Sequence, residues 1–172
     1  MRNFCITDGW GNEHWISRSI AVVVFVFARD IYSQEYILAE QRGKGTPDPE
    51  YVGKYCVPCG YLDYDETIVQ AAQRELMEET GLNFPTTDFK LLNINDLPKS
   101  DKRQNVTFRY IVNSNVPIED LSKLFTTKNS EKNEVESIKF IKLNKIDDYE
   151  WAFNHQELIK EIALKKEKTT TL

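Results

Sequence analysis

The segment GYLDYDETIVQAAQRELMEETGL, residues 60–82, contains the clearest helix signal in the chain. Thr67 followed by Gln70 is typical of a capping box, and Gly81 stands where a left-handed C-cap glycine belongs. The residues between them are good helix formers and include no Gly or Pro. The pattern therefore predicts a helix over residues 67–80.

Three glutamates of this helix, Glu75, Glu78 and Glu79, share an arc of about 100° when residues are placed on a helical wheel. The arc overlaps the apolar stripe that begins at Ile68. Because this stripe is expected to face the core, charges placed on it would not be solvated. Each pair, some 6 Å apart, would repel by roughly 2–3 kcal/mol at an effective dielectric near 20, and Arg74 can offset only its interaction with Glu78. Either the pKa values rise or a hard cation such as Mg²⁺ or Mn²⁺ binds. The alternative is an ordinary solvated acidic helix face.

Runs of β-branched and aromatic residues predict strands around this helix, at residues 20–28, 35–41, 89–95, 105–113 and 137–143. The first run does not alternate, so we expect a central strand that is buried on both faces. A short helix over residues 118–125 and a last helix that starts at Asn154 complete the pattern. Intermixed strands and helices predict α/β layers in one domain, residues 1–165, followed by a frayed polar tail, residues 166–172.

The chain has 172 residues, with 22 Lys and Arg against 27 Asp and Glu, and a net charge of −5. This charge repels nucleic-acid backbones, so we expect no nucleic-acid partner, and an anionic ligand must be held by local cations or a metal. The longest apolar run, residues 20–28, is too short to span a bilayer, so no membrane partner is expected. The lack of an apolar signal segment and the three cysteines favour a cytoplasmic location. The sequence leaves open whether the protein forms a homodimer.

Residues 60–82 resemble the Nudix box, G-x5-E-x7-R-E-U-x-E-E-x-G-U, with every specified position filled. At average residue usage such a match arises by chance less often than about once in a million. Pro58 before the box, and the late strand that follows Glu134, also agree with the family plan. The resemblance implies a Nudix-type α/β/α sandwich with a mixed β-sheet, in which the box forms a loop–helix–loop motif.

The resemblance further implies an enzyme that hydrolyses the diphosphate of a nucleoside diphosphate linked to another moiety. The cofactor would be Mg²⁺, with Mn²⁺ as the alternative. By position, Glu75, Glu78 and Glu79 would be catalytic metal ligands, and the backbone carbonyl of Cys59 would be a further ligand. Arg74 would hold a glutamate in place through a salt bridge.

The same resemblance assigns supporting roles to Glu66, near the helix start, and to Gly60, which would permit a tight turn. Two positions depart from the common family pattern: Cys59 replaces a glycine before Gly60, and Asp65 replaces a glycine before Glu66. Because a carbonyl ligand does not depend on its side chain, these changes put loop geometry in question and not the carboxylate cluster.

Candidates for the general base follow the box at a distance. They are Glu131, Glu134 and Glu136, and we favour Glu134 because family members often place a glutamate just before that strand. Exposed basic residues after the second strand, Arg42 and Lys44, are candidates for binding substrate phosphate, as are Lys102 and Arg103 in a later loop.

Cys56 and Cys59 form a CxxC pair, but no second pair stands at ligand spacing, so packing cysteines are expected rather than a zinc or redox site. Pro98 lies sixteen residues after Leu82, a distance that is associated with Nudix members acting on ADP-ribose. ADP-ribose-like compounds are therefore the first substrate candidates. The rival hypothesis is a non-catalytic Nudix module that binds a nucleotide or an ADP-ribose derivative.

Overall fold

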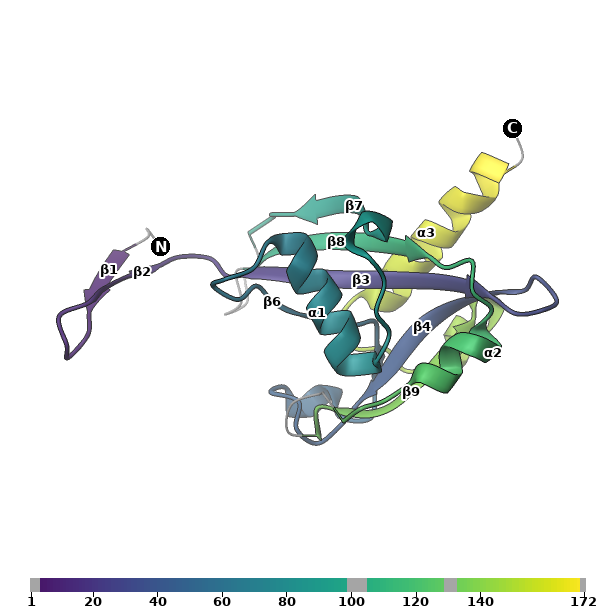
Figure 1. Ribbon diagram of the computed structural model, residues 1–172, viewed down its shortest axis with the longest axis horizontal. Helices are drawn as coiled ribbons and strands as arrows, with labels where there is room; N and C mark the ends of the chain where they lie inside the picture. Colours follow the sequence, from purple (N-terminus) through teal and green to yellow (C-terminus); the bar gives the residue numbers. More distant parts are fainter. Residues whose placement is uncertain (1–3, 99–104, 129–132, 171–172) are drawn as a thin grey trace.

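The computed structural model describes residues 4–98, 105–128 and 133–170 (Figure 1). The strands are β1 (Phe4–Thr7), β2 (Glu13–Ile16), β3 (Ile20–Arg29), β4 (Glu35–Arg42), β5 (Tyr55–Cys56), β6 (Cys59–Tyr61), β7 (Lys90–Asn95), β8 (Val106–Asn113) and β9 (Val135–Lys142). The α-helices are α1 (Ile68–Thr80), α2 (Ile118–Leu121) and α3 (His155–Thr170). Turns of 3₁₀ helix lie at Pro49–Tyr51, Thr86–Asp88, Ser122–Leu124 and Leu143–Asp148.

Strand β3 is the centre of a mixed, seven-stranded sheet. It runs parallel to β8 on one side, with Val23 opposite Arg109. On its other side it pairs antiparallel with β6 through its first half and with β4 through its second half. Strand β4 also pairs with β5 and β9, and β7 extends the sheet beyond β8. Along this edge of β3, the paired strand therefore changes from β6 to β4.

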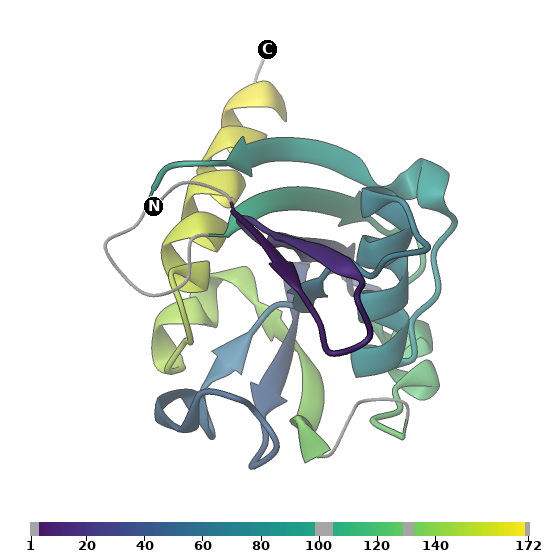
Figure 2. The ribbon, with the colours of Figure 1, turned by 90° about the vertical axis from the view of Figure 1, so that its left-hand side faces the viewer.

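Helices cover both faces of this sheet, and Figure 2 shows α1 and α3 on opposite sides of it. Alternate residues of β3 serve the two layers: Val22, Val24 and Val26 pack with α1, whereas Val23, Phe25 and Phe27 pack with α3. This explains why the run in the sequence is continuously apolar instead of alternating. The predicted α/β/α sandwich and its central strand are confirmed.

Helix α1 is delimited as its end residues predict. The Thr67 side chain accepts a hydrogen bond from the backbone of Gln70, whose own side chain accepts one from the Thr67 backbone, which completes the capping box. Gly81 is left-handed, with φ of 80°, and its N–H donates to the Met77 carbonyl at 2.8 Å. A Cβ atom at Gly81 would lie 2.6 Å from the Leu124 carbonyl oxygen, so packing as well as conformation requires glycine there.

Helix α3 continues to Thr170, past residue 166, where the sequence predicts the start of a polar tail. Within this segment the Lys166 ammonium lies 3.6 Å from the centre of the Phe27 ring and donates to the Asn113 side chain. These contacts join α3 to β3 and β8 at Lys166, which the local sequence does not reveal.

The antiparallel hairpin of β1 and β2 projects away from the sheet (Figure 1). Its turn is held by Asp8, whose carboxylate accepts hydrogen bonds from the backbone N–H groups of Trp10 and Asn12, each at 2.9 Å. Among the described helices none has the length and apolar character needed to cross a membrane.

Candidate active site

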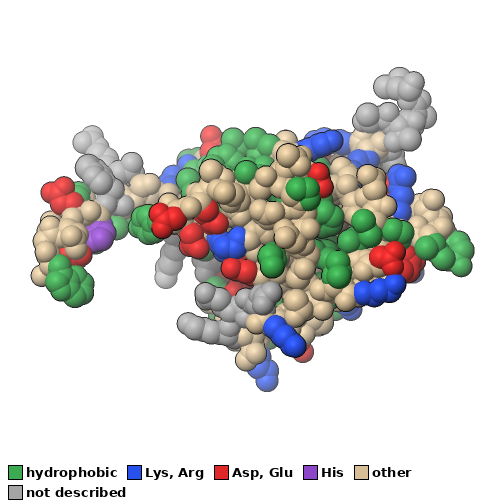
Figure 3. Space-filling view, in the orientation of Figure 1, with side chains coloured by type: hydrophobic (Ala, Val, Ile, Leu, Met, Phe, Trp, Pro, Cys, Tyr) green, Lys and Arg blue, Asp and Glu red, His purple; other side chains and the backbone are tan. Residues whose placement is uncertain are grey.

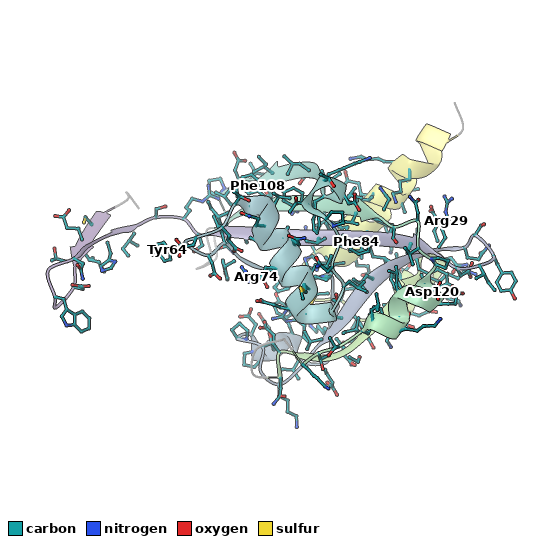
Figure 4. The ribbon with its side chains drawn as sticks, in the orientation of Figure 1. Arg29, Tyr64, Arg74, Phe84, Phe108 and Asp120 are labelled. Atoms are coloured by element: carbon teal, nitrogen blue, oxygen red, sulfur yellow. The ribbon has the colours of Figure 1, made fainter. Side chains whose placement is uncertain are left out.

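A cavity of about 400 Å³ lies where α1, β6, the first half of β3 and the start of α3 meet. In Figure 3, acidic side chains surround a basic one over α1, at the place that Figure 4 labels Arg74. The charged residues that line the cavity are Arg42, Asp48, Asp63, Arg74, Glu75, Glu78, Glu79, Arg109 and Glu134. The three predicted glutamates of α1 therefore share one cavity, together with Glu134 and Arg42.

Glu79 is the most deeply buried of the three α1 glutamates, with 4% of its surface exposed. Its Oε2 accepts a hydrogen bond from the backbone N–H of Cys59 at 2.9 Å. Burial raises the pKa of Glu79 well above its ordinary value, and the nearby charges of Glu40 and Glu75 act in the same direction. The acidic arc does overlap the buried face of the helix.

Glu75 lies directly against strand β6. A Cβ atom on Gly60 would be 2.2 Å from the Glu75 carboxyl group, so the carboxylate occupies the space that any side chain at position 60 would need. Burial raises the pKa of Glu75 to about 7. The expectation that Gly60 permits a tight turn is wrong: Gly60 lies within β6, opposite Val22, and glycine is required there for close approach.

Arg74 connects the helix to the loop before it. Its guanidinium lies 2.7 Å from Glu66, 2.8 Å from Glu75 and 3.1 Å from Glu78. Glu66 also accepts a hydrogen bond from the Asp63 N–H at 2.9 Å, and the hydrogen bond from Arg74 lowers the pKa of Glu66. Arg74 thus fixes the loop while it balances part of the charge on α1.

A second ion pair joins β4 to the residue before β9. The buried Arg42 guanidinium donates to Glu134 Oε1 at 2.9 Å and, through Nε, to Thr46 Oγ1 at 2.8 Å. Lys44 is exposed and is not part of the cavity lining, so the structure brings only Arg42 to the site. Glu136 is likewise exposed. The remaining candidates, Lys102, Arg103 and Glu131, lie outside the described residues.

The sequence reasoning missed Glu40, which is completely buried in β4. Its Oε1 accepts a hydrogen bond from the Cys56 thiol at 3.2 Å, whereas its Oε2 has no partner among the described residues. Burial raises the pKa of Glu40 to about 7. The sequence could have indicated this burial. Glu40 lies two residues after the apolar Leu38, and side chains two apart in a strand lie on the same face of the sheet.

His155 was also missed as a cavity residue, although it opens α3. It is buried, and its Nδ1 accepts a hydrogen bond from the Val57 N–H at 3.2 Å. Burial lowers the pKa of His155 to about 3, and the charges of Arg109 and Arg42 act in the same direction. His155 is therefore a neutral acceptor that links α3 to the segment before β6.

The donor groups at the site suit a hard divalent cation such as Mg²⁺ or Mn²⁺, because they are carboxylate and carbonyl oxygens. Since Val24 N–H bonds the Pro58 carbonyl, the next residue, Cys59, directs its N–H and C=O away from β3, toward Glu79. Within the described ranges, no three His, Cys, Asp or Glu side chains already surround a single point. Arg74 lies between Glu75 and Glu78, and both carboxylates would have to turn from it to bind an ion.

Solved structures share the fold of this chain. The NUDIX domain of Shewanella oneidensis NrtR, complexed with ADP ribose, has a TM-score of 0.67 and 20% identity over 87% of this chain and 89% of that one. A bifunctional NMN adenylyltransferase/ADP ribose pyrophosphatase from Francisella tularensis, complexed with AMP and a Mn ion, has a TM-score of 0.64 and 21% identity over 87% of this chain and 42% of that one. The Nudix hydrolase RenU from M. smegmatis has a TM-score of 0.63 and 16% identity over 98% and 96%.

The curated proteins compared with the chain include no match. The NUDIX domain profile, in contrast, matches residues 17–162, which is most of the chain. This span includes the helix with its three glutamates, the strands on both sides of it and the first turns of α3. The chain therefore belongs to the Nudix family.

Proposed function

We propose that the protein is a divalent-metal-dependent pyrophosphohydrolase that cleaves the diphosphate of a nucleoside diphosphate linked to another moiety. The observation that carries this proposal is the position of Glu79. Its carboxylate is buried against the Cys59 N–H and beside Glu75, in a cavity that Glu78 also lines. Carboxylates gathered so closely are stable in the charged form only beside a compensating cation.

Each residue of the site has a role in this reaction. Glu75, Glu78, Glu79 and the Cys59 carbonyl would hold the metal, which when bound neutralises phosphate oxygens and lowers the pKa of a bound water. Glu134 would act as the general base, and its ion pair with Arg42 orients the carboxylate toward the cavity. Arg74 would keep the loop and helix in register through Glu66.

ADP-ribose-like compounds are the first candidate substrates. A cavity of about 400 Å³ is in the size range of small-molecule sites. The compounds named with two similar structures, ADP ribose with the NrtR domain and AMP with the Francisella protein, support this substrate class. Pro98 adds nothing to it, because this residue is exposed and does not line the cavity.

The experiment that tests the proposal is a turnover assay over a panel of nucleoside diphosphate derivatives, with Mg²⁺, with Mn²⁺ and with EDTA. We expect two phosphorylated products from a preferred substrate, metal dependence, and loss of turnover in Glu79→Gln. Metal-independent turnover, or full activity of Glu79→Gln, would exclude the metal assignment.

The second candidate is a non-catalytic module that binds an ADP-ribose derivative, which the likeness to the NrtR domain with its ADP ribose favours. This function predicts calorimetric binding of ADP-ribose and no turnover of any nucleotide in the panel at saturating Mg²⁺ or Mn²⁺. The intact set of α1 carboxylates argues for the enzyme, since ligand binding alone does not require them.

A further inference from the structure

Three guanidinium groups line the cavity, and one of them differs from the others in its partners. Arg42 is paired with Glu134, and Arg74 with glutamates of α1 and its preceding loop. Arg109 makes no ion pair within the part of the chain that the structure describes. Its Nη1 donates to Asn93 Oδ1 at 3.4 Å, which is a weak contact, and its buried Nε has no partner there.

The strand register places Arg109 on the α3 side of the sheet. Arg109 lies opposite Val23, which in turn lies opposite Cys59, so the three side chains point to the same face. Two strand spacings, about 10 Å, separate the backbones of Arg109 and Cys59. Glu75 lies on the α1 side of the sheet, against Gly60, so Arg109 and the carboxylates line the same cavity from opposite faces of the sheet.

The cavity lining on the same strand as Arg109 and next to it consists of uncharged polar side chains. These are Asn95, Asn105 and Thr107, and the neutral His155 lines the cavity from the start of α3. Partial burial lowers the pKa of Arg109, which reflects the cost of removing its charge from water. The charge nearest in effect is that of Glu161, but Glu161 makes no direct ion pair with Arg109 in the described structure and is itself exposed and paired with Lys165. A half-buried charge so weakly compensated is unfavourable in the free protein, and a ligand that carries negative charge would compensate it.

We propose that Arg109 binds a phosphate group of the nucleotide ligand and selects phosphorylated ligands over nucleosides. The planar guanidinium can offer two parallel N–H donors to phosphate oxygens. The α1 carboxylates repel phosphate when no metal is bound, and the other two cavity arginines are already paired, so Arg109 supplies the attraction. The inference rests on the proposed function only in taking a nucleotide as the ligand.

Calorimetric titration in EDTA tests this proposal without any requirement for turnover. The ligands are AMP, adenosine and inorganic phosphate, and the proteins are the wild type, Arg109→Met, Arg109→Lys and the control Arg29→Met, whose side chain is exposed and paired with Glu35. We expect the wild type to bind AMP about 10-fold or more tightly than adenosine, the effect of one hydrogen bond to a charged group. Arg109→Met should lose this preference while still binding adenosine, Arg109→Lys should keep part of it, and Arg29→Met should keep all of it.

Thermal unfolding of the same variants separates ligand binding from a structural role. Removal of an uncompensated charge should leave the melting temperature of Arg109→Met unchanged or raise it. Competition by inorganic phosphate would show that the anion alone occupies the site; without competition, the nucleoside is also needed, and both results support phosphate binding by Arg109.

Three results would overturn the inference: no preference for AMP in the wild type, an unchanged preference in Arg109→Met, or a lowered melting temperature with equal losses for AMP and adenosine. Failure of the proposed hydrolase function gives a different result, namely no metal-dependent turnover while the Arg109-dependent preference persists.

Discussion

The backbone N–H of Cys59 donates to Glu79 Oε2 at 2.9 Å, so strand β6 and helix α1 are joined at the residue that the site depends on most. The bond selects one orientation of a carboxylate that is otherwise surrounded by apolar and acidic neighbours. It also brings the Cys59 carbonyl to the same side of β6. The cysteine that replaces the usual glycine therefore leaves the backbone groups at this position available to the site.

Replacement of Glu79 by glutamine should abolish most hydrolysis and leave the fold intact. Glutamine keeps an oxygen that can accept from Cys59 but removes the charge that a divalent ion requires. We expect kcat/KM to fall by about 100-fold. The melting temperature in EDTA should equal or exceed that of the wild type, because glutamine is neutral without having to take up a proton, as the buried Glu79 carboxyl must beside Glu75 and Glu40. Steady-state kinetics and thermal unfolding check both parts, and a large loss of stability would contradict the second.

Gly60→Ala should impair metal binding more than folding. The added Cβ would lie 2.2 Å from the Glu75 carboxyl, which is the movable end of a side chain, so the carboxylate must shift while the backbone stays. We expect a stability loss of no more than about 1–3 kcal/mol, together with a 10–100-fold fall in kcat/KM at limiting Mg²⁺.

The matched control for this variant is Gly9→Ala, because a Cβ there meets no atom within 4 Å. Kinetics over a range of Mg²⁺ concentrations distinguish the two variants. Wild-type Mg²⁺ dependence in Gly60→Ala would show that the position of the Glu75 carboxylate does not matter for the ion.

Glu134→Gln and Glu136→Gln form a second matched pair, since both glutamates flank the start of β9 but only Glu134 lines the cavity. Loss of a general base typically lowers kcat by about 10²–10⁴-fold. We expect such a loss, with little change in KM, for Glu134→Gln and near wild-type rates for Glu136→Gln. Equal rates in the two variants would assign the base elsewhere.

The sequence predicts features that depend on neighbouring residues. Helix α1 is delimited by Thr67 and Gly81, whose capping effects act over three or four residues, and its acidic arc follows from helical geometry alone. The central position of β3 follows from its unbroken apolar run, which only a strand buried on both faces can tolerate. These features are in the structure as predicted.

Features that depend on distant partners could not be predicted in the same way. The sequence predicts that Arg42 is exposed and binds phosphate, yet the pairing of β4 with β9 buries it against Glu134. The family resemblance predicts that Gly60 permits a turn, yet glycine is needed there because the Glu75 carboxyl occupies the space of a side chain. That Arg109 has no ion pair with any described residue is known only once the neighbouring strands have been placed.

His155 should make the protein less stable as the pH falls from neutrality, because it is neutral in the fold with a pKa of about 3, while the unfolded chain has an ordinary histidine of pKa about 6.5. Between these two values the unfolded state binds the extra proton, so the free energy of unfolding rises with pH. At pH 5 the free energy of unfolding is therefore about 2 kcal/mol lower than at pH 8 on account of His155.

His155→Asn keeps an acceptor for the Val57 N–H but cannot titrate. Urea unfolding at pH 5 and pH 8 should therefore show a smaller pH-dependent loss in the variant than in the wild type, by about 2 kcal/mol. Parallel curves for the two proteins would mean that His155 is protonated in the folded state, where its buried ring would then need an anionic neighbour instead of Arg109 and Arg42.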